Sequence, residues 1–144
     1  MKLTIAHQDG IWSVDWKGNK IISAGVDDQV LVWNSETYAQ LASLPGHQLG
    51  VISVDISTNG QYACSSSLDQ QVRIWNLQTF GLQQTIEAGP VEAWKVRFSP
   101  DARYIASGTH SGQIHTWITE TGEKDRTMET RGKFAMSVCY VIIK

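Results

Sequence analysis

Apolar and polar residues alternate over short stretches of this 144-residue chain, and the stretches recur. Between residues 51 and 56, apolar side chains alternate with Ser53 and Asp55, which is the period of two that a β-strand produces. A second strand-like run follows at 62–66, then a third, and a more polar fourth at 83–87. Because no segment shows a convincing amphipathic helical pattern, the sequence predicts an all-β protein.

The same pattern repeats along the chain. Trp33, Trp75 and Trp117 are spaced 42 residues apart, and a serine lies ten residues before each of them. Four short antiparallel strands per 40-odd residues are typical of one β-propeller blade. We therefore expect an outer strand for ring closure at 1–6, a first blade at 7–46, a second at 47–87, a third at 88–130, and the first strand of a fourth blade with a divergent tail at 131–144.

Composition narrows the classes of function. The formal net charge is -2 and lysines and arginines are scattered, which argues against direct nucleic-acid binding, since that normally requires a basic patch. No apolar run approaches the roughly 20 residues of a membrane span. The two cysteines, Cys64 and Cys139, lie in apolar runs and are expected to be buried, reduced thiols. These features are typical of an intracellular protein without membrane contact.

No catalytic or metal-binding constellation is visible. His110 and His115 are five residues apart, but no further ligands stand at zinc-like spacing. The glycine-rich stretch 108–112 lacks the lysine and helix that follow a phosphate-binding loop. No nucleophile, base and orienting group can be assembled. We therefore expect neither an enzyme nor a cofactor or metal site.

The repeats carry a signature made of a Gly-His pair, a serine, an aspartate six residues before a tryptophan, that tryptophan, and a final aspartate directly after it. The second unit has it complete except that Asn76 replaces a final aspartate, and in this it resembles the WD-repeat family. The third unit departs from it, with Pro90 near the histidine position and Ser111 at the aspartate position. The resemblance implies a buried hydrogen-bond network in the blades, formed by His7, Ser23, Asp27 and Trp33, by His47, Ser65, Asp69 and Trp75, and in the third blade by Ser107 and Trp117 only. We expect packing to be the main support of the third blade.

Several less common runs resemble one branch of that family. They lie at 46–57, 88–94, 107–110 and 130–134, and they are similar to WD-repeat subunits shared by the superkiller complex and the RNA polymerase II-associated factor (PAF) complex. The resemblance implies a seven-bladed propeller, of which this chain holds a little over three blades. It also implies a scaffold without catalysis, located in nucleus and cytoplasm. The implied partners are helicase and tetratricopeptide-repeat subunits of the superkiller complex and subunits of the PAF complex.

The repeat register also indicates where such partners would bind. In the WD-repeat family two positions of each blade tend to open onto the top face near the central channel. Large apolar side chains at such a mouth suit peptide binding. The residues at these positions here are Trp12, Val26, Ile52, Leu68, Trp94 and His110. The alternative is that they pack between adjacent blades.

Two other functions stay open. A propeller that reads a modified peptide would need an aromatic cage or an arginine cluster, but Arg73, Arg97 and Arg103 do not recur in register. A truncated form with no stable independent function is the other alternative, because an open arc of blades leaves inter-blade faces and strand edges uncovered.

Overall fold

The protein forms three four-stranded antiparallel sheets and no helix within residues 7–89 and 94–140, which are the residues that this computed structural model describes. The first sheet contains β1 (Ile11–Lys17), β2 (Lys20–Gly25), β3 (Val30–Asn34) and β4 (Gln40–Ser43). The second contains β5 (Val51–Ile56), β6 (Tyr62–Ser67), β7 (Gln71–Asn76) and β8 (Leu82–Glu87). The third contains β9 (Lys95–Phe98), β10 (Tyr104–Gly108), β11 (Gln113–Ile118) and β12 (Lys124–Glu129).

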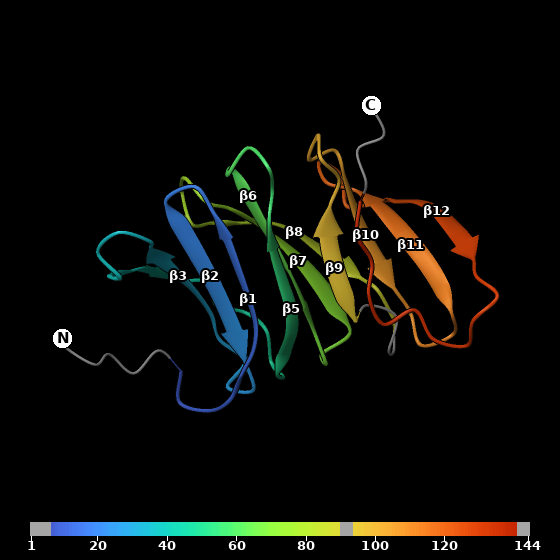
Figure 1. Ribbon diagram of the computed structural model, residues 1–144, viewed down its shortest axis with the longest axis horizontal. Coiled ribbons are helices and arrows are strands. Elements are labelled where there is room, and N and C mark those ends of the chain that lie inside the picture. Colours follow the sequence, from blue (N-terminus) through green and yellow to red (C-terminus); the bar gives the residue numbers. More distant parts are fainter. Residues whose placement is uncertain (1–6, 90–93, 141–144) are drawn as a thin grey trace.

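The three sheets stand side by side, as blades of a propeller do (Figure 1). Within each sheet the strands follow chain order, and the first strands of neighbouring sheets are in contact, β1 beside β5 and β5 beside β9. The prediction of an all-β propeller segment with about three blades is therefore confirmed. Among the described residues, no helix is long and apolar enough to cross a membrane.

The hydrophobic core lies between the blades. One cluster joins the first two sheets, where β2 and β3 of the first blade face β5 and Trp75 of the second. A second cluster joins the next pair and includes Ile74 of the second blade and Trp117 of the third. Because each blade is only one sheet thick, its apolar side chains are buried by the neighbouring blade rather than by its own strands.

The 42-residue repeat also appears in the backbone. Asp28 and Gln70 have positive φ values of 57° and 72°, and Gly112 stands at the same point of the third blade with φ 79°. This position lies in the turn between the second and third strands of each blade. Only glycine adopts this conformation without a steric cost, so the first two blades keep the turn in spite of their side chains.

Residues 131–140 differ from the sequence expectation. The first strand of a fourth blade was expected there, but no strand forms over these residues, so this expectation is wrong. After Thr130 the chain turns back over its own blade, where the Ala135 N–H donates to the Thr109 carbonyl at 2.9 Å. No further strand of the described chain is available as a hairpin partner, so the segment stays irregular. Cys139 is exposed here, contrary to expectation, while Cys64 is buried.

The outer strand expected at residues 1–6, the departure from the signature at Pro90 and the end of the divergent tail at 141–144 lie outside the described residues.

Candidate functional site

A chain of buried polar side chains crosses the second blade. His47, in the segment before β5, places Nε2 2.8 Å from Ser65 Oγ on β6 and Nδ1 2.8 Å from Asp69 Oδ2 in the β6–β7 turn. The Trp75 indole on β7 donates to the same Ser65 hydroxyl at 3.1 Å. Four residues from four separate segments are therefore joined in one network.

The chemistry of the donors sets the direction of every bond in this network. An indole N–H can only donate, so the Ser65 hydroxyl accepts from Trp75; it gives its own hydrogen to His47 Nε2 because the Asp69 carboxylate can only accept and takes the proton of the neutral ring from Nδ1. His47 then carries its proton on Nδ1 and donates it to Asp69. Burial lowers the pKa of His47, although Asp69 opposes this effect, so the neutral ring that the network requires is also the form that burial favours.

The aspartate of this network fixes the turn in which it lies. Asp69 accepts from the backbone N–H of Gln48 at 3.1 Å and of Gln71 at 3.0 Å. Burial alone raises the pKa of Asp69, but the His47 bond and these N–H groups outweigh it and hold the pKa below its usual value. The turn is thus tied at once to the strand that follows it and to the segment that precedes the blade.

The first blade repeats this arrangement. His7 lies 2.8 Å from Ser23 Oγ through Nε2 and 2.8 Å from Asp27 Oδ1 through Nδ1, and Trp33 donates to Ser23 at 2.9 Å. The two blades share these contacts because the four residues occupy equal positions in the repeat.

The third blade is held differently. Ser107 donates to the carbonyl of Gly108 at 3.2 Å, and Ser111 pairs with the Thr109 hydroxyl at 2.8 Å instead of meeting a histidine. The His115 ring packs edge-on against Trp117, with ring centroids 5.8 Å apart, and its Nδ1 lies 2.9 Å from Thr127 Oγ1. Trp117 is buried and belongs to the apolar cluster between the second and third blades.

Asn34 and Asn76, which stand where the WD signature ends in aspartate, close the next turn. The Asn34 side-chain oxygen accepts from the N–H of Glu36 and Thr37 at 2.9 and 2.8 Å. Asn76 accepts from Gln78 and Thr79 at 2.8 and 3.1 Å. An amide oxygen thus does here what a carboxylate would do, which explains why the substitution preserves the turn.

A second set of polar contacts joins the blades to one another, and the sequence analysis missed it. A serine and an aspartate two residues apart on the first strand of one blade accept backbone N–H groups from the first strand of the next blade. The distances are 3.1 Å for Val54 N to Ser13, 2.9 Å for Ile56 N to Asp15, 3.3 Å for Val96 N to Ser53 and 2.7 Å for Phe98 N to Asp55. The signal was the repeated Ser-Val-Asp at 13–15 and 53–55, which looked like ordinary strand alternation.

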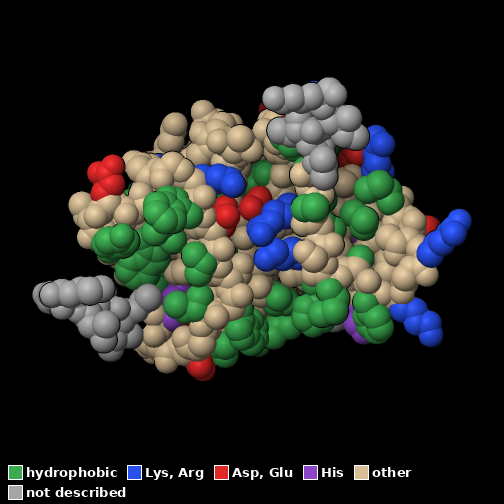
Figure 2. Space-filling view, viewed as in Figure 1, with side chains coloured by type: hydrophobic (Ala, Val, Ile, Leu, Met, Phe, Trp, Pro, Cys, Tyr) green, Lys and Arg blue, Asp and Glu red, His purple; other side chains and the backbone are tan. Residues whose placement is uncertain are grey.

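Charged side chains gather where these strands meet, near the middle of the view in Figure 2. The Arg97 guanidinium lies 3.0 Å from Asp55 Oδ1. Burial nevertheless raises the pKa of Asp55 to about 6, against the effects of the Phe98 N–H and Arg97. Asp55 therefore gains a proton more easily in the folded protein than in the unfolded chain.

This raised pKa predicts a pH effect. Between pH 3.8 and about 6, folded Asp55 binds more protons than the unfolded chain does, so its contribution to stability falls as the pH rises through this window. A shift of this size corresponds to about 3 kcal/mol. Urea unfolding of the wild type and Asp55→Asn at pH 4, 5, 6 and 7 measures it. We expect the stability of the wild type relative to the variant to fall across this range, and a constant difference would contradict the assignment.

The candidate partner-binding residues lie at one end of the blades. Trp12, Val26 and Leu68 are exposed, and the Trp12 side chain is 50% accessible. Hydrophobic side chains show along the lower edge of Figure 2, the end to which the β2–β3 and β6–β7 turns of Figure 1 belong. Gly50 leaves room for the Trp12 side chain, because a Cβ at Gly50 would lie only 2.8 Å from the indole ring. Leu49 beside it is also exposed, so the patch extends beyond the residues expected from the sequence.

The other candidates are more covered. Ile52 and Trp94 are half-buried. His110 is exposed, and its ring meets Phe134 edge-on at a centroid distance of 4.5 Å. The segment after β12 therefore contributes an aromatic ring to this end of the third blade.

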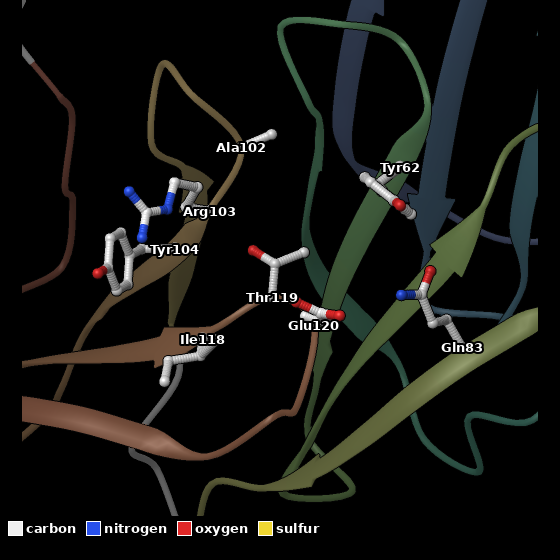
Figure 3. A pocket seen from close by; sticks show the side chains of 8 residues that line it. All are labelled: Tyr62, Gln83, Ala102, Arg103, Tyr104, Ile118, Thr119 and Glu120. Carbon is white, nitrogen blue, oxygen red and sulfur yellow. The ribbon is translucent and has the colours of Figure 1, made fainter.

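A cavity of about 500 Å³ lies between the second and third blades (Figure 3). Its walls include Tyr62, Arg103, Tyr104 and Glu120, and the buried hydroxyl of Thr119 has no partner among the described residues. The Arg103 guanidinium lies over the Tyr104 ring, 5.8 Å from its centroid. Because a cation already covers that ring, the cavity is not an open aromatic cage for a modified lysine.

No group of three or more histidine, cysteine, aspartate or glutamate side chains in the described part of the chain could hold a metal ion.

Comparison with known proteins places these features in a family. The family model for the WD domain, G-beta repeat, matches residues 1–34, 38–76 and 82–117, which is more than half of the chain. Each matched segment ends at or next to one of the three tryptophans spaced by 42 residues.

Individual relatives match shorter stretches. Superkiller complex protein 8 of Dictyostelium discoideum is 38% identical over 64 residues, covering 42% of this chain and 21% of that protein. WD repeat-containing protein SL1-17 of Schistosoma mansoni is 40% identical over 67 residues, covering 40% of this chain and 22% of that protein. U4/U6 small nuclear ribonucleoprotein PRP4 of Saccharomyces cerevisiae is 34% identical over 62 residues, covering 40% of this chain and 13% of that protein. The matched part thus spans less than a quarter of each relative.

Proposed function

The chain belongs to the WD-repeat family, and on this premise we propose that it is a non-catalytic scaffold that binds other protein subunits. The observation that carries the proposal is the group of exposed apolar side chains at one end of the blades, Trp12, Val26 and Leu68. Large apolar side chains on a rigid support supply most of the binding energy of a protein interface. Rigidity comes from the networks, since Asp69 fixes the turn that carries Leu68.

The partners that we propose are subunits of the superkiller complex, its helicase and tetratricopeptide-repeat proteins, and subunits of the PAF complex. The similarity to superkiller complex protein 8 supports the first assignment. The second, and a location in both nucleus and cytoplasm, rest on the sequence runs at 46–57 and 107–110. A role in mRNA decay and in transcription elongation would follow from these assemblies.

We expect Leu68→Asp to lower recovery of these subunits at least tenfold, because a carboxylate on this patch must lose its water on binding. Leu82→Asp is the matched control, because Leu68 and Leu82 are 44% and 47% exposed and lie in the same blade. Tagged full chains are used to purify the superkiller helicase and the PAF subunits, which are quantified by immunoblotting. Equal recovery with both variants would count against this surface.

A further inference from the structure

The two junctions between blades differ in polarity at equivalent positions. Leu77, in the turn after β7, is 1% exposed and belongs to the apolar cluster that joins the first two blades. Thr119 stands 42 residues later in the turn after β11, where its N–H donates to the Arg103 carbonyl at 2.9 Å. The Leu77 N–H makes the equivalent bond to the Gln61 carbonyl at 2.8 Å. Between the second and third blades, a threonine therefore takes the place of a core leucine.

The Thr119 side chain is costly to stability in this place. It is 4% exposed, and its hydroxyl has no hydrogen-bond partner among the described residues, whereas a leucine would bury no polar atom. Thr119 lines the cavity of about 500 Å³, and in Figure 3 its side chain stands between Arg103 and Tyr62. A cavity of this volume is typical of a ligand site. A polar group that stability does not favour, placed at such a cavity, indicates binding.

The charged residues at this cavity have neutral counterparts at the first junction. Arg103 and Glu120 line the cavity, whereas Gln61 and Gln78 stand at the same points of the second blade. Neither Arg103 nor Glu120 forms an ion pair within the described part of the chain. The Arg103 guanidinium lies over the Tyr104 ring, and its N–H donors extend from the edge of its plane. The cavity thus offers one positive and one negative group to a ligand.

These groups restrict the chemistry of the ligand. A phosphate or another purely anionic group would meet the Glu120 carboxylate, and a purely cationic group would meet Arg103. A purely apolar group would leave the Thr119 hydroxyl unpaired. We propose that the cavity binds a short peptide segment of a partner protein in which an acidic and a basic side chain lie close together. The carboxylate binds Arg103, the basic side chain binds Glu120, and a main-chain amide between them pairs with Thr119.

This site is separate from the apolar surface that contains Leu68. Because the strands of each blade are antiparallel, the β9–β10 and β11–β12 turns lie at the end of the blades opposite to the β2–β3 and β6–β7 turns. Arg103 belongs to the β9–β10 turn, and Thr119 and Glu120 belong to the β11–β12 turn. The protein then holds different partners at its two ends.

A peptide titration tests this proposal. The isotope-labelled full chain is titrated to about 10 mM with acetyl-Glu-Ala-Lys-amide, with the reversed acetyl-Lys-Ala-Glu-amide, and with the uncharged acetyl-Gln-Ala-Gln-amide. We expect saturable NMR shifts at the Thr119 and Glu120 amides with at least one charged peptide and not with the uncharged one. High salt is expected to weaken this binding. Equal shifts with charged and uncharged peptides, or no shifts with any of them, would overturn the proposal.

The double variant Arg103→Gln with Glu120→Gln is the matched control. It gives this junction the two glutamines that the first junction carries, and both side chains are exposed, so we expect the fold to be kept. The charged peptide is expected to bind at least tenfold more weakly to this variant. Unchanged affinity would show that the charges play no part in binding and would overturn the proposal.

Thr119→Leu tests the buried hydroxyl by a different measurement. The leucine fills part of the cavity and removes an unpaired polar group, so we expect a higher urea midpoint of unfolding together with loss of the peptide shifts. Peptide binding that persists in this variant would contradict the proposed site. Because Leu68 lies at the other end of the blades, either failure leaves the proposed function untouched.

Discussion

Ser65→Ala is expected to lower the free energy of unfolding by about 2–4 kcal/mol, although it removes a single oxygen atom. The Ser65 hydroxyl accepts from the Trp75 indole and donates to His47, and all three residues are buried. Without it, an N–H and a ring nitrogen remain in a dry interior without a partner. Each such group costs about 1–3 kcal/mol. Urea unfolding followed by circular dichroism gives the difference.

The neighbouring serine supplies the control. Ser66 is as completely buried as Ser65, but its hydroxyl has no hydrogen-bond partner among the described residues. Ser66→Ala therefore removes a buried polar group that gains nothing in the folded state, and we expect it to leave stability unchanged or raise it. Equal losses in both variants would mean that packing at β6, and not the network, accounts for the effect.

Trp75→Ala is expected to cost about 3–5 kcal/mol, as large-to-small changes of core aromatics do. Trp75 is 1% exposed and belongs to the cluster between the first and second blades. The loss therefore weakens an inter-blade contact as well as the network. Because about 5–15 kcal/mol is the usual total stability of a domain, this loss is a large share of the total, and the same urea unfolding measures it.

Trp16→Ala is the matched change at the surface. Its side chain is 59% exposed, and its indole donates to the Gly18 carbonyl at 2.9 Å in solvent. Changes of this kind usually stay within about 0.5 kcal/mol. The double variant Ser65→Ala with Trp75→Ala adds a test, because the two residues share one hydrogen bond. We expect it to lose less stability than the sum of the losses in the two single variants. Full additivity would argue against a joint network.

The same network connects stability to the proposed binding surface. Asp69 holds the β6–β7 turn through backbone N–H groups on both sides of it, and Leu68 stands immediately before Asp69 in that turn. A partner that binds Leu68 therefore meets a preformed surface and loses less entropy on binding. In the third blade Ser111 stands at the aspartate position and pairs with the Thr109 hydroxyl, so His110 lies on a turn that is held by hydroxyl groups and not by a carboxylate.

Much of the blade architecture could be predicted from the chain alone. The tryptophans spaced by 42 residues and the serines ten residues before them marked the units, because every blade repeats the same order of strands and turns. The first strand of a fourth blade, expected within 131–144, does not form over residues 131–140, because repeat spacing indicates a strand only where a partner strand is present. The alternation at 13–15 and 53–55 correctly predicted strands, but it did not predict the contacts that these serines and aspartates make with the next blade. A strand pattern does not tell which neighbouring strand its polar side chains reach.

The sequence by itself determined the strands of the three units and the residues that cross the first two blades, because strand period and repeat spacing are local properties of the chain. Only the tertiary structure decided which equivalent positions are buried. Val14 and Val54 stand at the same point of the repeat, yet one is 56% exposed and the other fully buried. The difference arises because burial depends on whether another sheet lies against that face, and the residues of one blade do not carry that information.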